Sequence, residues 1–596
     1  MKLEKLWSNW MIPFLTTRAV DSSLFAVAQA DEISEFIKRM AEVPRLADMW
    51  SLDRQVYALM AAWMDVSQRM AIYHAIASVP WSKAYERYSA SFADTEKEDA
   101  KDFDWRKGFE AWREIADKEL ISNMRSRDFL AAQRELLRSV LDLRIRQQEV
   151  ADSVGRLYGV PTQHDFDDLA RQITELRREL RASPTQRSVV KGATAQPDNQ
   201  ERDKIMSDPR YPTFNTFNGF NSFNSFNSFN SFNSFNSFNS FMKDCAENFG
   251  RFHKAADVLA ATGNVDVDIG ATPKTLVMRR DKVELFRYEP TAERTVETPV
   301  LIVYGLIGRY TFLDLQPDRS LVRSLLDKGI NLWLIEWGQP GRGERWLTID
   351  DYVDYIHEAV HRICHETGHD RVTLLGICEG GVLATCYAAL HPEKVKNLVL
   401  AATPIDFHAD IDDTAADPGL LNIWTRSLAP EDIDHIVDVL GVIPGEFMGS
   451  LFTLMTPMNS LTKYNVDLLE KLADKDKLIN FLRMEKWLAD RPDHPGAAGR
   501  QWLKELYHEN RLVEGSFELS GRVVDLRAIV APVLNIFALN DHIIPPACSK
   551  ALGSKIGTTE YKEIGLDCGH VGLFVSSKSQ GSLAEIIAEW LKARDE

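Results

Sequence analysis

One stretch, residues 371–391, constrains the fold of this 596-residue chain more than any other. A short apolar run of strand type, Val372 to Ile377, leads through the pentad Gly-Ile-Cys-Glu-Gly into an apolar segment of helical type. A sharp strand-to-helix turn strains its central residue and needs small residues two positions to either side, which Gly376 and Gly380 provide. Cys378 would then lie at a helix N-terminus, where the helix dipole favours a thiolate. The stretch predicts a nucleophilic cysteine, with a buried cysteine in a glycine-rich turn as the alternative.

Strand-type runs recur along the C-terminal half and alternate with helical segments. Near-continuous apolar strands separated by helices are typical of a mostly parallel sheet covered on both faces, so we expect an α/β fold. No strand of similar quality lies between Ala402 and Pro532, where the chain is helical and rich in Trp, Phe, Leu and Met. We therefore expect a helical cap inserted at residues 404–525. The expected strands are Lys282 to Tyr288, Pro299 to Tyr304, Ile330 to Ile335, Val372 to Ile377, Asn397 to Ala402, Pro532 to Ala538 and Glu560 to Ile564.

A nucleophilic cysteine needs a base, and the base needs an orienting acid. In doubly wound folds with such a turn, the acid and then the histidine follow later in the chain, each just after a strand. Asp541 follows the expected strand that ends at Ala538, and His570 lies in a glycine-flanked loop after the next one. Order and context predict a catalytic triad of Cys378, Asp541 and His570.

The predicted oxyanion hole consists of two backbone N–H groups. One belongs to Glu379, directly after the nucleophile, and the other comes from the loop after the strand ending at Tyr304. Ile307 is the predicted donor in that loop.

Several residues compete for these roles. His542 adjoins Asp541, but adjacent residues in a turn seldom face each other. Asp567 is expected to shape the turn before His570. Four histidines at steps of four resemble metal ligands, yet no carboxylate motif accompanies them, so we expect a solvated helix face and no metal site. These histidines are His357, His361, His365 and His369, and the cysteines expected only to pack are Cys386 and Cys568.

Residues 1–190 predict an all-helical domain, because glycine is scarce and apolar residues recur at helical spacing. A stripe from Leu136 to Leu157 stops at Gly159, a helix-stop signal. Thr162 can cap a second helix. In that helix the apolar residues follow alternating steps of three and four with charged flanks, which favours a partner-binding or self-associating helix over one packed on its own domain. These apolar residues are Phe166, Leu169, Ile173, Leu176 and Leu180.

A low-complexity linker, residues 191–241, separates the helical domain from the α/β domain expected at 242–596. Phenylalanine occupies every third position from 214 to 241, a period that matches neither strand nor helix. We expect a disordered tether; an aromatic segment that adsorbs to an apolar surface is the functional alternative.

Composition excludes several classes of protein. The formal charge of −17 argues against a nucleic-acid partner, because neutralising phosphates needs a surplus of Lys and Arg. Six cysteines without a CxxC pair indicate neither a zinc site nor a disulfide framework and fit a reducing cytoplasm. The sequence has no run of about eighteen apolar residues, so we expect no transmembrane segment. Polar and charged residues near the N-terminus argue against a signal peptide.

Several separated passages resemble one family. From about Lys282 onward the chain is similar to the catalytic subunit (PhaC-like) of the two-subunit polyhydroxyalkanoate (PHA) synthases of class III or IV. The helical region, through Gly159-Val-Pro-Thr and Leu-Arg-Arg-Glu-Leu-Arg, resembles their non-catalytic partner subunit (PhaE-like). The chain departs from the pattern by joining both parts, and by having Glu379 where Gln is usual. The matching passages are Pro299-Val-Leu-Ile-Val-Tyr, Leu375-Gly-Ile-Cys-Glu-Gly-Gly, Thr403-Pro-Ile-Asp-Phe, Asn480-Phe-Leu-Arg-Met-Glu-Lys-Trp-Leu, Pro532-Val-Leu-Asn-Ile-Phe-Ala-Leu-Asn-Asp-His-Ile-Ile-Pro-Pro and Gly569-His-Val-Gly.

The resemblance implies an α/β-hydrolase fold and a poly(3-hydroxyalkanoate) synthase. Such an enzyme polymerises (R)-3-hydroxyacyl-CoA, here expected to be 3-hydroxybutyryl-CoA, and releases CoA through an acyl thioester on Cys378. We expect no cofactor, a homo-oligomer, and a cytoplasmic location at the surface of polyester granules. Two other hypotheses remain. A cysteine-variant hydrolase, such as an esterase or lactonase, shares the pentad but not the other passages, and a non-catalytic granule-binding protein would not need the intact triad.

Overall fold

The computed structural model describes residues 51–93, 105–182, 267–409, 419–455, 475–576 and 579–595. The expected linker and its phenylalanine repeat lie outside these residues. The chain divides into two compact units, one of residues 1–170 and 266–596 and one of residues 171–265. The domain boundaries expected from the sequence stay a prediction.

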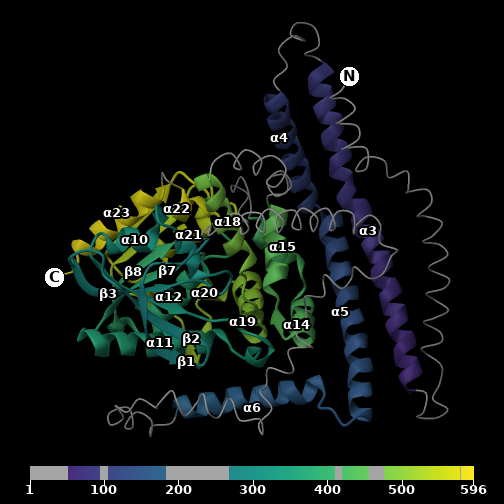
Figure 1. Ribbon diagram of the computed structural model, residues 1–596, viewed down its shortest axis with the longest axis horizontal. Helices are drawn as coiled ribbons and strands as arrows, with labels where there is room; N and C mark the ends of the chain where they lie inside the picture. Colours follow the sequence, from purple (N-terminus) through teal and green to yellow (C-terminus); the bar gives the residue numbers. More distant parts are fainter. Residues whose placement is uncertain are drawn as a thin grey trace. The chain divides into compact units, whose positions relative to one another are not determined.

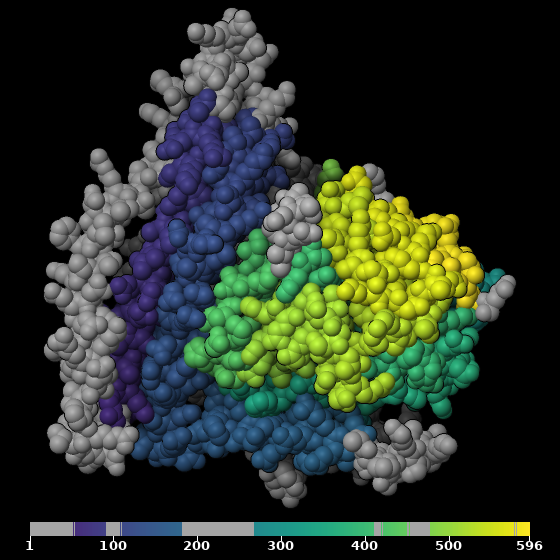
Figure 2. All heavy atoms as spheres, turned by 180° about the vertical axis from the view of Figure 1, so that it is seen from behind, coloured from purple at the N-terminus to yellow at the C-terminus, as the bar shows by residue number. Residues whose placement is uncertain are grey.

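The described part of the N-terminal region is entirely helical, as predicted. Helices α3 (Ser51–Ala93), α4 (Trp105–Met124) and α5 (Arg127–Leu157) follow one another, and α3 and α5 lie side by side (Figures 1 and 2). They run antiparallel, because Tyr73 contacts Phe129 while Val66, earlier in α3, shares a small core with Leu143. Apolar stripes at helical spacing therefore pack helix against helix here.

The predicted helix boundary near Gly159 is confirmed. α5 ends at Leu157, and Gly159 adopts φ +68°, a left-handed conformation that glycine tolerates best. α6 (Gln163–Ala182) begins with the expected cap, since the Thr162 N–H and hydroxyl both donate to Asp165 at 2.7 Å. Among the described residues, no helix is both long and apolar enough to cross a lipid bilayer.

The C-terminal half has the predicted α/β fold, built on an eight-stranded sheet in the order β1-β2-β6-β3-β7-β8-β13-β14. Strands β6, β3, β7, β8, β13 and β14 are parallel. β1 and β2 pair antiparallel at one edge, and β2 continues antiparallel to β6. The strands are β1 (Lys274–Arg280), β2 (Val283–Tyr288), β3 (Val296–Val303), β6 (Ile330–Glu336), β7 (Val372–Ile377), β8 (Val395–Ala401), β13 (Val533–Ala538) and β14 (Tyr561–Leu566).

Two hydrophobic clusters cover the two faces of this sheet. In β3, Leu301 and Val303 belong to one cluster and Val300 and Ile302 to the other, as the alternation of side chains along a strand requires. The first cluster includes α11 (Ile349–Thr367) and α12 (Glu379–Leu390), and the second includes α10 (Leu321–Leu326) and α23 (Ser579–Lys592). Helices on both faces leave the carboxyl ends of the parallel strands as the place for a site.

A largely helical insertion lies between β8 and β13, and we call residues 404–525 the cap. It also contains short antiparallel strand pairs, which the sequence did not predict: β9 (Val442–Ile443) with β10 (His494–Pro495), and β11 (Glu518–Leu519) with β12 (Arg522–Val523). Within its described residues, the cap helices are α13 (Leu420–Ser427), α14 (Pro430–Leu440), α15 (Gly445–Met455), α18 (Lys475–Ala489), α19 (Gly496–Gln501), the π-helix η9 (Trp502–His508) and α20 (Arg511–Glu514).

Candidate active site

Cys378 lies at the turn between β7 and α12. Its backbone has φ 51° and ψ −121°, and it occupies the N-cap position of α12. A positive φ is costly for a residue with a side chain and persists only where the surroundings enforce it. Two backbone hydrogen bonds do so: the Cys378 N–H donates to the Ala401 carbonyl at 2.9 Å, and the Gly381 N–H donates to the Cys378 carbonyl at 2.9 Å. The side chain of Cys378 is half-buried.

The two glycines of the pentad are required by close backbone packing. A Cβ on Gly376 would lie 2.5 Å from Gly381 Cα, and a Cβ on Gly380 would lie 2.2 Å from the Val303 carbonyl oxygen. These separations leave no space for a methyl group. The predicted strand-turn-helix geometry is therefore present at Cys378.

Asp541 and His570 lie together beyond the carboxyl ends of β13 and β14. His570 Nδ1 is 2.7 Å from Asp541 Oδ2. The other oxygen of Asp541, Oδ1, accepts hydrogen bonds from the N–H groups of Ile543 (2.9 Å) and Ile544 (2.8 Å). The Asp541 side chain is only 1% exposed, so the carboxylate is held rigidly and directed at the imidazole. Asp541 therefore sets the orientation of His570.

The electrostatics of His570 connect it to Cys378. Burial by itself would lower the pKa of His570, but the Asp541 carboxylate, the charge of a Cys378 thiolate and side-chain hydrogen bonds to both residues raise it well above its ordinary value. An imidazole between a carboxylate and a thiol is suited to accept the thiol proton and hold it.

The region of the predicted oxyanion hole holds an unexpected contact. Glu379 Oε2 accepts hydrogen bonds from the N–H groups of Leu306 (2.7 Å) and Ile307 (3.0 Å). The N–H of Ile307 therefore already has an acceptor within the protein. The backbone N–H of Glu379, at the first position of α12, is the other predicted donor, and the oxyanion hole itself stays a prediction.

The competing residues lie elsewhere or make other contacts. His542 is exposed, and Asp567 accepts a hydrogen bond from the Asn540 side chain at 2.9 Å. Cys386 is fully buried, which raises its pKa to about 12, and the half-buried Cys568 packs against a hydrophobic cluster. His361 and His365 are exposed on α11, whereas His357 of the same helix is half-buried with its Nδ1 3.3 Å from the Tyr387 hydroxyl, so the expectation of a solvated face is wrong for His357. His369 lies beyond the C-terminal end of α11. No group of three or more His, Cys, Asp or Glu side chains within the described ranges is placed to hold a metal ion.

Comparison with protein families divides the chain in the same way as its composition. Residues 2–183 match a family described as a poly(R)-hydroxyalkanoic acid synthase subunit. Residues 225–325 match the N-terminus of poly-beta-hydroxybutyrate polymerase (PhaC), and residues 298–577 match the α/β hydrolase fold.

Comparison with characterised proteins gives the same result. The chain is 41% identical over 350 residues to the poly(3-hydroxyalkanoate) polymerase subunit PhaC of Synechocystis, covering 58% of this chain and 90% of that one. It is also 41% identical over 331 residues to the PhaC subunits of Thiocystis violacea and Allochromatium vinosum, covering 55% of this chain and 90% of each of those. This chain belongs to the poly(3-hydroxyalkanoate) polymerase family. In this polymerase the catalytic part follows a region similar to the family's separate helical subunit, so the predicted fusion is confirmed.

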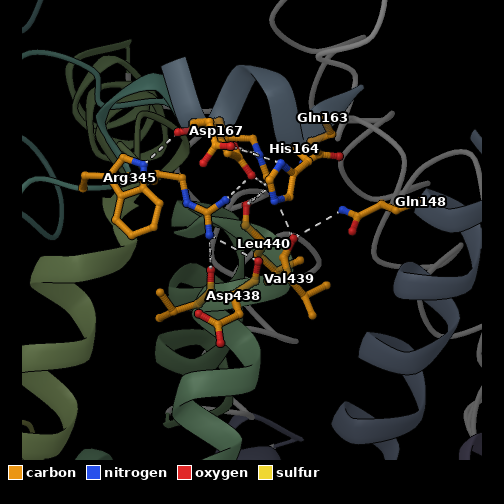
Figure 3. A network of polar contacts seen from close by, with 12 residues as sticks. Gln148, Gln163, His164, Asp167, Arg345, Asp438, Val439 and Leu440 are labelled. Carbon is orange, nitrogen blue, oxygen red and sulfur yellow. Dashed lines mark hydrogen bonds and ion pairs between the residues drawn. The ribbon is translucent and has the colours of Figure 1, made fainter. Parts of the chain in front are cut away.

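Sequence reasoning missed two sets of residues in this polymerase. His494 of β10 contacts the side chain of Glu379, 115 residues away, and no local pattern marks it. Asp167 of α6 contacts Arg345 (Figure 3) and Arg342, both of which follow β6. These arginines contact carbonyl groups at the end of α14. Both sets join segments far apart in the sequence, so only the folded chain reveals them.

Proposed function

We propose that this chain polymerises (R)-3-hydroxyacyl-CoA, with 3-hydroxybutyryl-CoA as the first candidate, into a polyester and releases CoA. Cys378, His570 and Asp541 would form the catalytic triad, and Cys378 would carry the acyl group as a thioester. The single observation that supports this best is the geometry around two elements of the fold: a strained cysteine at the N-terminus of α12, and a histidine that is held by a buried aspartate and that its raised pKa couples to that cysteine. Family membership indicates which acyl-transfer chemistry that geometry performs.

In the acylation step, His570 accepts the proton of the Cys378 thiol, and Sγ attacks the thioester carbonyl of the substrate. The carbon–sulfur bond to CoA breaks, and CoA leaves as a thiol with the proton from His570. Exchanging one thioester for another is nearly isoenergetic, so the acyl group stays activated. A serine ester in the same place would lose that activation.

In the elongation step, the 3-hydroxyl of another acyl unit attacks the thioester on Cys378. His570 accepts the hydroxyl proton, the new ester bond forms, and the thiol of Cys378 is regenerated. Asp541 stabilises the imidazolium that forms in each step. Water competes with the hydroxyl, so the cap of residues 404–525 would serve to exclude it.

The helical region would act as an activator of the catalytic part. Contacts between the two support this role. Arg138 of α5 pairs with the buried Asp432 of α14. The side chain of Gln148 donates to the Val439 carbonyl at 3.3 Å (Figure 3). Both contacts reach the cap. We place the working enzyme in the cytoplasm at the surface of polyester granules, where its product accumulates.

The test is incubation of the full chain with 3-hydroxybutyryl-CoA, with free CoA measured by a thiol reagent and insoluble product by solvent extraction. CoA release with insoluble polyester is expected. Release with soluble 3-hydroxybutyrate would instead indicate the cysteine-variant hydrolase. In Cys378→Ser, CoA release should fall at least about 1,000-fold, as losses of catalytic nucleophiles generally do, and full turnover by this variant would contradict the assignment of the nucleophile.

A further inference from the structure

The side chain of Glu379 is anchored at both ends, immediately after the nucleophile. Oε2 accepts the N–H groups of Leu306 and Ile307, in the loop after β3, while Oε1 lies 2.9 Å from His494 Nε2. The side chains of Glu379 and His494 are 4% and 5% exposed, so solvent cannot replace these contacts. A buried carboxylate is tolerated only when its oxygens are satisfied in this way.

His494 brings the cap to this carboxylate. It lies in β10, whose partner strand β9 contains Val442 and Ile443. Its other ring nitrogen, Nδ1, is 3.3 Å from the Pro495 carbonyl oxygen, so Nε2 is the nitrogen that serves Glu379. The residues just after β10 are fixed in turn, because the Gly496 N–H donates to the Gly441 carbonyl at 3.1 Å. The cap therefore holds His494 against the residue that follows the nucleophile.

We propose that Glu379 and His494 form a positioning pair for acyl transfer at Cys378. Anchoring both carboxylate oxygens fixes residue 379, whose backbone N–H is the expected oxyanion donor, and His494 makes that anchoring depend on the cap. The pair touches neither the thiol nor the substrate carbonyl; it acts through the position of the Glu379 N–H. The inference rests on the proposed function only in requiring that Cys378 is the residue acylated.

Two reactions of Cys378 can distinguish whether the Glu379–His494 pair positions the oxyanion donor or only supports the structure of the site. Acylation by an ester develops negative charge on the carbonyl oxygen and needs the oxyanion donor. Alkylation by iodoacetamide develops no such charge and needs only the thiol with His570. Loss of the positioning pair should slow the first reaction selectively, whereas a loosened site would slow both.

Two variants of His494, to Gln and to Asn, allow the two reactions to be compared while a polar side chain of similar size is kept at position 494. The amide nitrogen of Gln can replace His Nε2 and donate to Glu379 Oε1, whereas that of Asn replaces Nδ1 and does not reach Oε1. His494→Gln should therefore retain acylation and His494→Asn should lose it. Glu379→Gln should also retain acylation, because its amide oxygen accepts the loop N–H groups and its amide nitrogen serves the other tautomer of His494.

The experiment uses the full chain, with p-nitrophenyl butyrate and iodoacetamide as probes and mass spectrometry of the Cys378 peptide as the readout. His508→Ala is the matched control, since His508 Nε2 contacts the Thr425 carbonyl elsewhere in the cap. In His494→Asn we expect acylation to fall about 30-fold or more, toward the loss seen on removing an oxyanion donor, with alkylation changed less than about 3-fold. In His494→Gln and His508→Ala both rates should stay within about 3-fold of the wild type.

Unchanged acylation in His494→Asn would overturn the inference, and so would a parallel fall of both reactions. CoA release from 3-hydroxybutyryl-CoA is measured alongside to separate the two proposals. If the wild type released no CoA while His494→Asn still selectively slowed ester acylation, the positioning pair would stand and the polymerase proposal would fail.

Discussion

At the scale of single residues, the nucleophile depends on glycines that leave no room for a side chain. A Cβ on Gly380 would lie 2.2 Å from the Val303 carbonyl oxygen and 2.4 Å from the Tyr304 carbonyl carbon, both backbone atoms of the adjoining segment. Neither can move without displacing β3. The strand-to-helix turn around Cys378, residues 376–380, which we call the elbow, is therefore set by backbone packing as much as by the cysteine.

Gly380→Ala should lower the free energy of unfolding by about 1–3 kcal/mol, as overpacking generally does. Thermal unfolding followed by circular dichroism measures the effect. Gly581→Ala in α23 is the control, because nothing lies within 4 Å of a Cβ there and alanine favours a helix. An equally stable Gly380→Ala protein would contradict the close packing described for the elbow.

The raised pKa of His570 predicts a pH-dependent contribution to stability. The folded chain holds the imidazolium between Asp541 and Cys378 more tightly than the unfolded chain does. That stabilisation is complete below the unfolded pKa, about 6.5, and is lost as pH rises through the higher folded pKa. The melting temperature of the wild type should therefore exceed that of His570→Gln by more at pH 6 than at pH 9. The corresponding change in the free energy of unfolding is on the order of 1 kcal/mol.

Asp541→Asn supplies the matched comparison for this measurement. Without the carboxylate the pKa of His570 should fall, so the excess stability at low pH should shrink. A difference between wild type and His570→Gln that instead grew with rising pH would show that the imidazolium is not the stabilised form.

At the scale of elements, the local sequence pattern was enough to predict the central strands of the sheet and the elbow. β7 was predicted at Val372 to Ile377 and spans those residues, because a short, largely apolar run that leads into the pentad is characteristic of a buried parallel strand. β1 was not predicted, because Lys274–Arg280 is a half-exposed edge strand recognisable mainly by its pairing with β2. The β9–β10 pair escaped for the same reason, since two-residue strands have no period.

The residues of the candidate site divide in the same way, into those that a local sequence pattern predicts and those that only the folded chain reveals. Asp541 and His570 were found because each follows a strand, and the sheet brings strand ends together. His494 could not be found, since its partner Glu379 lies 115 residues earlier and its strand has only two residues. Contacts set by the cap require the folded chain.

Helix α6 carries an apolar stripe that is exposed to solvent. Leu169 is 51% exposed and Leu176 57%, at positions of the predicted heptad seam. We expect this stripe to pair with a second copy of the chain. Leu169→Glu/Leu176→Glu should therefore lower the molar mass measured by light scattering after gel filtration, whereas Gln172→Glu should not. An unchanged molar mass in the double variant would exclude α6 as the self-association surface.

At the scale of the whole molecule, the carboxylate of Asp167 is one of the contacts that join the helical region to the catalytic part. Asp167 Oδ1 and Oδ2 accept hydrogen bonds from Arg342 at 2.9 and 2.8 Å, and Asp167 also pairs with Arg345. Arg342 donates to the Leu440 carbonyl at 2.8 Å, at the C-terminal end of α14, where cations are favourable. The carbonyl of Arg345 accepts the Ala497 N–H at 2.8 Å, three residues after His494. Through Arg342 and Arg345, Asp167 is therefore connected to the part of the cap that holds His494.

Asp167→Asn should lower the rate of CoA release by about 5- to 50-fold, because Arg342 and Arg345 lose their charged partner and no longer hold the end of α14. Asp168→Asn is the control, since its carboxylate lies 3.3 Å from His164 on the same helix. Deleting residues 1–190 should leave a folded but poorly active catalytic part. Activity that survived both changes would show that the helical region is not an activator.

The most direct test of the account is the chemical identity of the acylated residue during polymerisation. The full chain would be mixed with 3-hydroxybutyryl-CoA, quenched in acid within one turnover, digested, and analysed by mass spectrometry. We predict one or more 3-hydroxybutyryl units on the peptide that contains Cys378, removable by hydroxylamine as a thioester. CoA release with the acyl group on another residue, or with no acyl group on the protein, would contradict the role assigned to Cys378.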